Sequence, residues 1–222
     1  MHRRGQFITF EGPDGSGKST QIRYLADYLR SRQIPYLLTR EPGGTALGDQ
    51  IRAMVLNPDN ACMVDQTEIL LYAAARSQHV REKIEPALAD GQMVLCDRFT
   101  DASLAYQGYG LAQDVSIVKQ INRFATGGLE PDRTFLIDVS PETGRERMRH
   151  RKGDAERGAT QQASDLDRIE ARALAYHRSV REGFLTIYRE NKQRITLIDG
   201  EQEPLLVYQS IVRQIDALLA IH

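Results

Sequence analysis

A glycine-rich stretch near the start of the chain has the residue types and the spacing of a phosphate-binding loop. Residues 12–19 match the pattern G-x-x-x-x-G-K-[ST], with a strand-like run before them and a helical pattern after them. In such a loop, backbone N–H groups surround the β-phosphate, Lys18 contacts the β- and γ-phosphate oxygens, and Ser19 offers a hydroxyl to Mg²⁺. A chance glycine-rich turn is the alternative, and the flanking elements argue against it. The residues predicted to bind ATP are Gly12, Pro13, Asp14, Gly15, Ser16, Gly17, Lys18, Ser19 and Thr20.

Asp14 is the unusual member of this loop. A carboxylate that pointed into the phosphate site would repel the ligand. We therefore expect Asp14 to point away, toward an acceptor molecule, where it could accept a hydrogen bond from a sugar hydroxyl. The alternative is an aspartate that stabilises the turn by bonding to its own backbone.

A second charged group, Asp97-Arg98, directly follows the apolar run Met93–Cys96. If that run is a parallel strand, both side chains lie at the carboxyl edge of the sheet, beside the phosphate-binding loop. Asp97 is then placed for the Mg²⁺ shell, and Arg98 for a bidentate contact with phosphate, where it would act as a catalytic cation together with Lys18. A surface ion pair is the alternative.

Two further groups of residues have helical spacing. Glu68, Tyr72 and Arg76 are four residues apart, so one helix face would carry an aromatic ring and a guanidinium group. The second group, at positions i, i+3 and i+4, is Ser103, Tyr106 and Gln107. Spacing alone leaves two interpretations open, a base-binding surface or ordinary core and solvated residues.

The elements that must position these residues are five strand-like runs that alternate with helical patterns. The runs are 7–10, 36–39, 93–96, 134–137 and 195–198. Helical patterns cover about 47–56 and about 65–89, and a later one carries Ile117, Ile121 and Phe124. This alternation predicts an α/β fold with a five-stranded, doubly wound parallel sheet, and ligands at the carboxyl ends of its strands.

The overall composition indicates one enzyme-sized domain without an extended charged surface. The chain has 222 residues and a formal net charge of -1, so it lacks the overall field that draws proteins to nucleic acid or to anionic membranes. We see no apolar stretch long enough to cross a membrane and no signal sequence, and we expect a cytoplasmic protein. Cys62 and Cys96 are the only cysteines and do not support a zinc site.

One segment departs from this regularity. Residues 149–164 show no apolar periodicity and carry several charges, two glycines and two adjacent glutamines. We expect a mobile loop here, part of a lid at about 149–168. The whole chain, 1–222, is then a single domain with a phosphate loop at 12–19 and an acceptor-binding region at about 41–110.

Across nearly its whole length the sequence resembles bacterial thymidylate kinases. The stretches that carry the resemblance are 10–20 (Phe-Glu-Gly through Ser-Thr), 39–45 (Thr-Arg-Glu-Pro-Gly-Gly-Thr), 71–76 (Leu-Tyr-Ala-Ala-Ala-Arg), 97–99 (Asp-Arg-Phe), 103–108 (Ser-Leu-Ala-Tyr-Gln-Gly) and 167–170 (Asp-Arg-Ile-Glu). The resemblance implies a P-loop kinase fold with a mobile lid, transfer of the γ-phosphoryl group of ATP to dTMP, a need for Mg²⁺, and a homodimer.

The resemblance also implies a role for each residue on the acceptor side. Tyr72 would stack on thymine, Arg76 would donate to its O4 oxygen, and Arg98 would hold the acceptor phosphate. Asp14 would contact the 3′-hydroxyl of the sugar, and Tyr106 would crowd its 2′ position. Ser103 and Gln107 would contact the edge of the base. Glu41 would lie near the metal and the acceptor phosphate.

The composition of the phosphate loop makes the lid important for catalysis. The loop contains no arginine at its variable positions, as in the bacterial proteins whose lid supplies a cation to the phosphates. The lid here is longer than we expect for the family, and the candidate catalytic cations are Arg151, Arg157 and Arg168. Transfer to a monophosphate needs no general base, because the acceptor oxygen is already a nucleophile at neutral pH.

Two other functions would suit parts of the sequence. A regulatory GTPase would need an Asn-Lys-x-Asp element, and the one Asn-Lys pair, Asn191-Lys192, is followed by Gln-Arg and precedes the last strand. A kinase for a different nucleoside monophosphate would share the phosphate loop and differ in the residues that bind the base.

Overall fold

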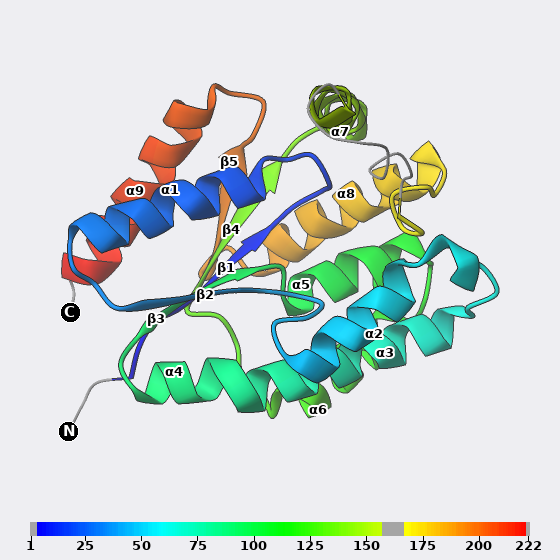
Figure 1. The fold of residues 1–222 in the computed structure, drawn as a ribbon, viewed down its shortest axis with the longest axis horizontal. Coiled ribbons are helices and arrows are strands. Elements are labelled where there is room, and N and C mark those ends of the chain that lie inside the picture. Colours follow the sequence, from blue (N-terminus) through cyan, green and yellow to red (C-terminus); the bar gives the residue numbers. More distant parts are fainter. Residues whose placement is uncertain (1–3, 157–166, 221–222) are drawn as a thin grey trace.

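A five-stranded parallel sheet forms the centre of the computed structural model, which describes residues 4–156 and 167–220 (Figure 1). The strand order is β2-β3-β1-β4-β5. The strands are β1 (Phe7–Glu11), β2 (Tyr36–Arg40), β3 (Met93–Asp97), β4 (Arg133–Asp138) and β5 (Ile195–Asp199). All five predicted strands are confirmed, as is the doubly wound parallel arrangement.

Helices connect every pair of consecutive strands. Those before β3 are α1 (Lys18–Ser31), α2 (Ala46–Leu56), a short 3₁₀ turn η1 (Pro58–Asn60), α3 (Asp65–His79), a π-helical stretch η2 (Val80–Ile84) and α4 (Glu85–Ala89). Those after β3 are α5 (Thr100–Ser103), the π-helical η3 (Leu104–Gly110), α6 (Val115–Thr126), α7 (Pro141–Glu156), α8 (Leu174–Glu190) and α9 (Pro204–Ala220). The single helix predicted for about 65–89 is therefore a continuous run of α3, η2 and α4.

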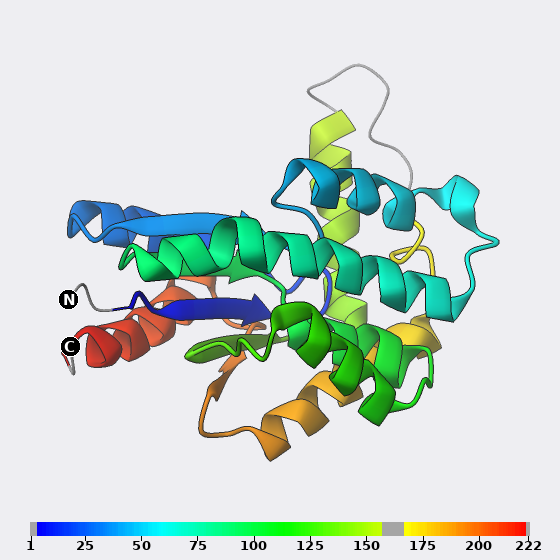
Figure 2. The same cartoon turned by 90° about the horizontal axis from the view of Figure 1, so that it is seen from below.

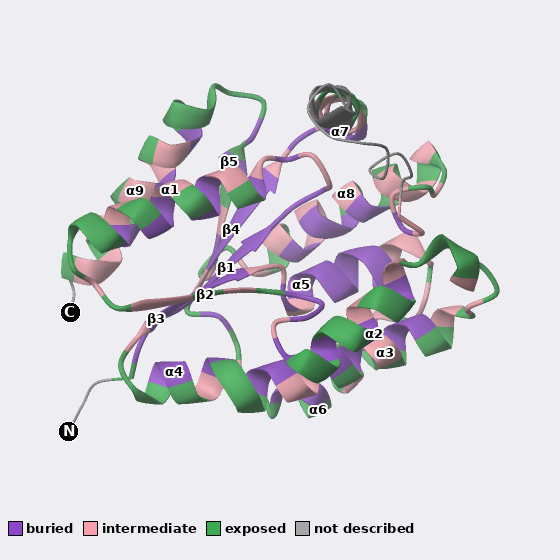
Figure 3. Cartoon of the chain, viewed as in Figure 1, coloured by how far each residue is buried: buried purple, intermediate pink, exposed green. Residues whose placement is uncertain are grey.

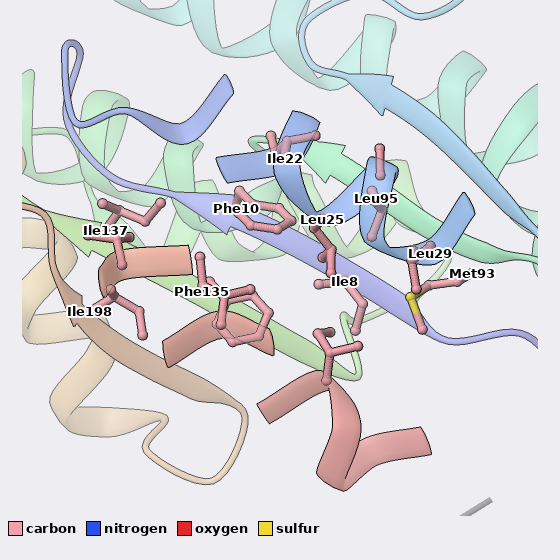
Figure 4. Close-up of a cluster of buried hydrophobic side chains, with 14 residues drawn as sticks. Ile8, Phe10, Ile22, Leu25, Leu29, Met93, Leu95, Phe135, Ile137 and Ile198 are labelled. Atoms are coloured by element: carbon pink, nitrogen blue, oxygen red, sulfur yellow. The ribbon is translucent and has the colours of Figure 1, made fainter. Parts of the chain in front are cut away.

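The inner strands β3, β1 and β4 are buried on both faces because they carry apolar residues at nearly every position, whereas the edge strands β2 and β5 are partly exposed. On one face, α1 and α9 pack over Ile8, Phe10 and Phe135, all fully buried (Figures 1 and 4). On the other face, η2 and α4 cover Phe7 and Val94. Figure 3 shows the central strands buried, whereas the edge strand β2, the outer surfaces of the helices and several loops carry exposed residues.

The register of the sheet brings the predicted site residues together. Phe10 of β1 lies opposite Asp97 of β3, so the phosphate loop after β1 and the Asp97-Arg98 pair after β3 leave the sheet side by side. On its other side, β1 pairs with β4, and the buried hydroxyls of Thr9 and Thr134 are 2.7 Å apart across that pair. The expected position of the site, at the carboxyl edge of the sheet, follows directly from this pairing.

The structure corrects the prediction for residues 149–156, which continue α7 to Glu156 and do not form a loop. Arginine, glutamate, lysine and methionine are good helix formers, so a sequence without apolar periodicity can still be helical where it projects into solvent. Figure 2 shows α7 extending away from the body of the molecule. Residues 157–164 of the predicted loop lie outside the described residues.

Helix α6 exposes apolar residues that would be expected to face the core. Its buried residues include Val118, Asn122 and Ala125, whereas Phe124 is 90% exposed and Ile117 is 53% exposed. The apolar residues that marked this helix in the sequence therefore lie largely on the surface. Within residues 4–156 and 167–220, no helix is long and apolar enough to cross a membrane.

Candidate active site

The phosphate loop joins β1 to α1 through a backbone that requires glycine at particular positions. Gly12 has φ +137°, and a Cβ atom there would come within 2.2 Å of the Ile137 carbonyl oxygen. Gly15 has φ +76°, and its Cβ would meet the carbonyl oxygen of Gly144 at 2.2 Å. These close approaches explain why larger residues are excluded from both positions. The loop is thus packed against β4 and α7.

Lys18 is the first residue of α1, and its ammonium group lies against the loop itself. Nζ donates to the carbonyl oxygens of Gly12 and Pro13 at 3.0 and 2.8 Å. Burial and the nearby Arg98 charge lower the pKa of Lys18 to about 8, against the opposing effect of neighbouring carboxylates. The remaining predicted ATP-binding residues, Asp14 to Thr20, line one cavity of about 630 Å³ above the loop, which we call the donor cavity.

Two oxygen-bearing side chains lie together beside this loop. Ser19 Oγ donates to Asp97 Oδ2 at 3.0 Å, and both residues line the donor cavity. The described residues contain no cluster of three or more His, Cys, Asp or Glu side chains able to hold a metal on their own. A hydroxyl and one carboxylate nevertheless fit Mg²⁺, which keeps several waters and takes its other ligands from substrate phosphates.

Arg98 links the phosphate loop to the acceptor side. Its φ of +69° is unusual for a residue with a side chain, and such a conformation costs about 1–3 kcal/mol, which the surrounding contacts must offset. Nη2 donates to Asp14 Oδ1 at 2.5 Å and to the Tyr106 hydroxyl at 3.0 Å. Tyr106 in turn donates to Asp14 Oδ2 at 2.8 Å. Asp14 therefore points away from the phosphate cradle, as predicted.

Arg98, Lys18 and Tyr106 together determine the charge state of Asp14. Burial opposes ionisation of the carboxyl, but the Arg98 and Lys18 charges and the Tyr106 hydrogen bond outweigh it and lower the pKa of Asp14 to about 2. Asp14 is consequently an acceptor at neutral pH, available to a hydroxyl group of a ligand.

Glu11, the last residue of β1, supports the turn that carries Arg98. Its side chain is buried, and Oε1 accepts a hydrogen bond from the Phe99 N–H at 2.7 Å. Oε2 is buried without a hydrogen-bond partner among the described residues. Burial and the charge of Asp101 raise the pKa of Glu11 to about 8. Sequence reasoning missed this residue, because its apolar neighbours suggested only the end of a strand.

Arg76 is almost fully buried and is held by four hydrogen bonds. Nε donates to Glu41 Oε2 at 2.7 Å, and Nη1 donates to Ser103 Oγ at 3.0 Å and to Asn122 Oδ1 at 2.5 Å. Nη2 donates to the Phe99 carbonyl at 3.1 Å. Because a guanidinium group has five N–H donors, one donor on Nη2 is left for a ligand. Glu41 is fixed from its other side by His79 Nδ1 at 3.0 Å.

All eight residues predicted for the acceptor side line a second cavity, which we call the acceptor cavity. They are Asp14, Glu41, Tyr72, Arg76, Arg98, Ser103, Tyr106 and Gln107. The two cavities meet, because Asp14, Glu41 and Arg98 line both of them. Hydrogen bonds from Arg76 to Ser103 and from Gln107 to Glu68 join the two groups that helical spacing had indicated.

Comparison with known proteins agrees with this arrangement. The family model described as thymidylate kinase matches residues 10–211. The chain is 50% identical over 198 residues to a thymidylate kinase of Exiguobacterium sibiricum, covering 89% of this chain and 88% of that protein. It is 48% identical over 208 residues to that of Carboxydothermus hydrogenoformans, covering 94% and 95%. This chain belongs to the thymidylate kinase family.

A solved structure of the family supports the fold as well as the sequence match. The crystal structure of thymidylate kinase from Ehrlichia chaffeensis superimposes with a TM-score of 0.74 at 32% identity, and covers 96% of this chain and 99% of that one. The GTPase interpretation has no support, since Asn191-Lys192 precedes β5 and so lies at the opposite edge of the sheet from the phosphate loop.

The three lid arginines predicted as catalytic cations have different positions in this thymidylate kinase fold. Arg168 donates from Nη2 to Glu68 Oε2 at 2.6 Å and from Nε to the Val55 carbonyl at 2.8 Å, and it is directed away from the donor cavity. Arg151 belongs to the last turns of α7, where only the backbone is described, and Arg157 lies outside the described residues.

Other arginines of the cavities were missed by the sequence reasoning. Arg147 of α7 lines the donor cavity and donates to the Gly200 carbonyl at 2.9 Å. Arg52 of α2 lines both cavities. Had residues 149–156 been recognised as helical, the four-residue spacing of Arg147 and Arg151 would have indicated a basic helix face over the phosphates.

Proposed function

We propose that this chain transfers the γ-phosphoryl group of ATP to dTMP, giving dTDP and ADP. The observation that carries the proposal is the junction of the donor and acceptor cavities at Asp14 and Arg98. A phosphoryl group passing from one nucleotide to another must cross such a junction while both nucleotides are bound.

The chain's own groups would act mainly by position and charge. Lys18 and Arg98 would neutralise charge on the transferring group, and loop N–H groups would hold the phosphates of ATP. Mg²⁺, held by Ser19 and Asp97, would supply charge neutralisation at the β- and γ-phosphate oxygens. Asp14 would accept a hydrogen bond from the 3′-hydroxyl of the acceptor, since its carboxylate is ionised and lies at the junction.

The acceptor cavity suits a pyrimidine that carries a carbonyl at position 4. The remaining Nη2 donor of Arg76 would bind thymine O4, and Tyr72 would stack on the ring. Cytosine presents an amino donor at that position and would be rejected. Uracil lacks only the methyl group, so discrimination against dUMP should be on the order of 1–3 kcal/mol.

The test is a turnover assay with ATP and each of the common nucleoside monophosphates in turn. We expect dTMP to be the best acceptor, dUMP to follow, and dCMP and the purine monophosphates to be used poorly. A purine monophosphate preferred over dTMP would refute the proposal and favour a different monophosphate kinase.

The protein is further proposed to be a homodimer. Helices α2, α3 and α6 lie together on one side of the molecule, and α3 packs against both of the others (Figure 1). Each exposes large apolar side chains, among them Met54, Leu70, Ile117 and Phe124. A second copy would cover such a face. Phe124→Glu should produce monomers in sedimentation analysis, while a dimer that survives this change would place the interface elsewhere. The cytoplasmic location stays a prediction.

A further inference from the structure

A buried carboxylate lies between the acceptor cavity and residues 167–172. Glu68 of α3 is 0% exposed. Its Oε2 accepts hydrogen bonds from Arg168 Nη2 and Arg172 Nη2, each at 2.6 Å. Its Oε1 accepts from Gln107 Nε2 at 2.9 Å. We call these four residues the Glu68 cluster. Spacing in the sequence grouped Glu68 with Tyr72 and Arg76, and no role in the proposed reaction has been given to it so far.

The cluster determines which end of the Gln107 amide is available to a ligand. A carboxylate only accepts hydrogen bonds, so the NH₂ end of the amide must turn toward Glu68. The Gln107 side chain makes no other hydrogen bond with the described residues, and it lines the acceptor cavity. Its carbonyl oxygen is therefore the end left for the ligand. We propose that Glu68 is a positioning residue that fixes this polarity and thereby makes the acceptor cavity selective for a base with an N3–H donor.

The polarity matters because pyrimidines differ at two adjacent atoms. Thymine and uracil have an N3–H donor and an O4 acceptor, whereas cytosine has an N3 acceptor and an N4 amino donor. The free donor of Arg76 and the carbonyl oxygen of Gln107 together match the first pattern and oppose the second at both atoms. A Gln107 amide turned the other way would pair with cytosine N3. This reasoning rests on the proposed function, since it takes the acceptor cavity as the site of the base.

The same carboxylate also holds residues 167–172 in place. The Arg168 N–H donates to the Leu56 carbonyl at 3.0 Å, and Arg168 Nε donates to the Val55 carbonyl at 2.8 Å. Residues 167–172 are thus held against the carbonyl groups of α2 by Arg168 and against Glu68 by two guanidinium groups. Glu68 therefore contributes both to the orientation of Gln107 and to the position of this segment.

The test compares acceptor preference in the parent protein and in Glu68→Gln. The amide introduced at position 68 can donate as well as accept, so the Gln107 amide is free to rotate and present its NH₂ group to the ligand. We expect the ratio of kcat/KM for dCMP to that for dTMP to rise about 10-fold, with the dUMP to dTMP ratio and the KM for ATP unchanged. The matched control is Glu82→Gln: Glu82 accepts from Gln78 Nε2 at 2.8 Å on an exposed surface, so the same chemical change there should leave every ratio unchanged.

A second variant keeps the proposal testable if Glu68→Gln does not fold. Gln107→Leu removes the amide, and the dCMP to dTMP ratio should again rise about 10-fold. In this background Glu68→Gln should add no further change, because both act through one amide. The proposal is overturned if Gln107→Leu leaves the ratio within about twofold of the parent, or if Glu68→Gln lowers kcat/KM for all three acceptors equally, as a purely structural role would. Failure of the parent to use dTMP would instead refute the proposed function.

Discussion

Replacing Glu11 by glutamine should change the way in which the stability of the protein depends on pH. In the folded protein, burial raises the pKa of Glu11 from 4.5 to about 8. Between these two pH values the folded protein retains a proton that the unfolded chain has released, so the stability of the parent should fall as pH rises through this window. Glutamine does not titrate, so the unfolding free energy of the Glu11→Gln variant should not show this decrease with pH.

The size of the effect follows from the width of the window. Each pH unit is worth about 1.4 kcal/mol, which sets a limit of about 5 kcal/mol for the full interval. Glu11 is 1% exposed, so solvent offers little screening. The glutamine oxygen can still accept from the Phe99 N–H, and its NH₂ group takes the unpartnered position of Oε2, a cost that does not vary with pH.

Urea unfolding at pH 5 and at pH 8 provides the assay. The free energy of unfolding of Glu11→Gln, relative to the parent, should increase by about 2–4 kcal/mol between the two pH values. Glu182→Gln is the control, because the Glu182 side chain is 66% exposed and the change should leave the pH dependence as it is. The assignment of a retained proton would be refuted if the difference in unfolding free energy between Glu11→Gln and the parent were the same at both pH values, or decreased with pH.

Three further predictions concern catalysis. Lys18→Ala should lower kcat by about 10³-fold or more with an unchanged far-UV circular dichroism spectrum, and near-normal turnover would remove the phosphate loop from the mechanism. Arg98→Ala should raise the KM for dTMP and lower kcat together, since its guanidinium would contact the acceptor in both ground and transition states, and an unchanged KM would count against that contact. For the lid, Arg168 is engaged with Glu68, so alanine at Arg151 or Arg157 should cost about 10³-fold in kcat at the position that supplies the cation. Turnover within a few-fold of the parent in the variant that lacks both arginines would mean that the lid supplies none.

Much of the fold could be predicted because its signals are local. Each strand is a short apolar run, and each is followed by a turn or by the start of a helix, so order and type followed from the sequence. The phosphate loop was equally local, since its glycines and Lys18 lie within one short stretch. The acceptor cavity could be predicted only in part, because helical spacing shows which residues share a helix face but not what that face contacts.

The remaining features depend on partners that are distant in the sequence. Glu11 looks like a strand residue, and its raised pKa comes from burial and from Asp101, ninety positions later in the chain. The Glu68 cluster joins α3 to residues about a hundred positions away. In α7, charged residues with good helix propensity and without an apolar face resembled a loop. Such features need the tertiary arrangement before they can be recognised.

The pairing of β1 with β3 also limits which insertions and deletions the protein can accept. Phe10 lies opposite Asp97 in the register of these strands. A deletion of one residue in either strand would displace the phosphate loop from Arg98 by about 3.3 Å, and would turn the apolar side chains of that strand to the opposite face. The turn at 57–63, which joins α2 to α3 at the surface, carries no such constraint. Length variation in this protein should therefore be confined to its helix connections, while the two central strands keep a fixed number of residues.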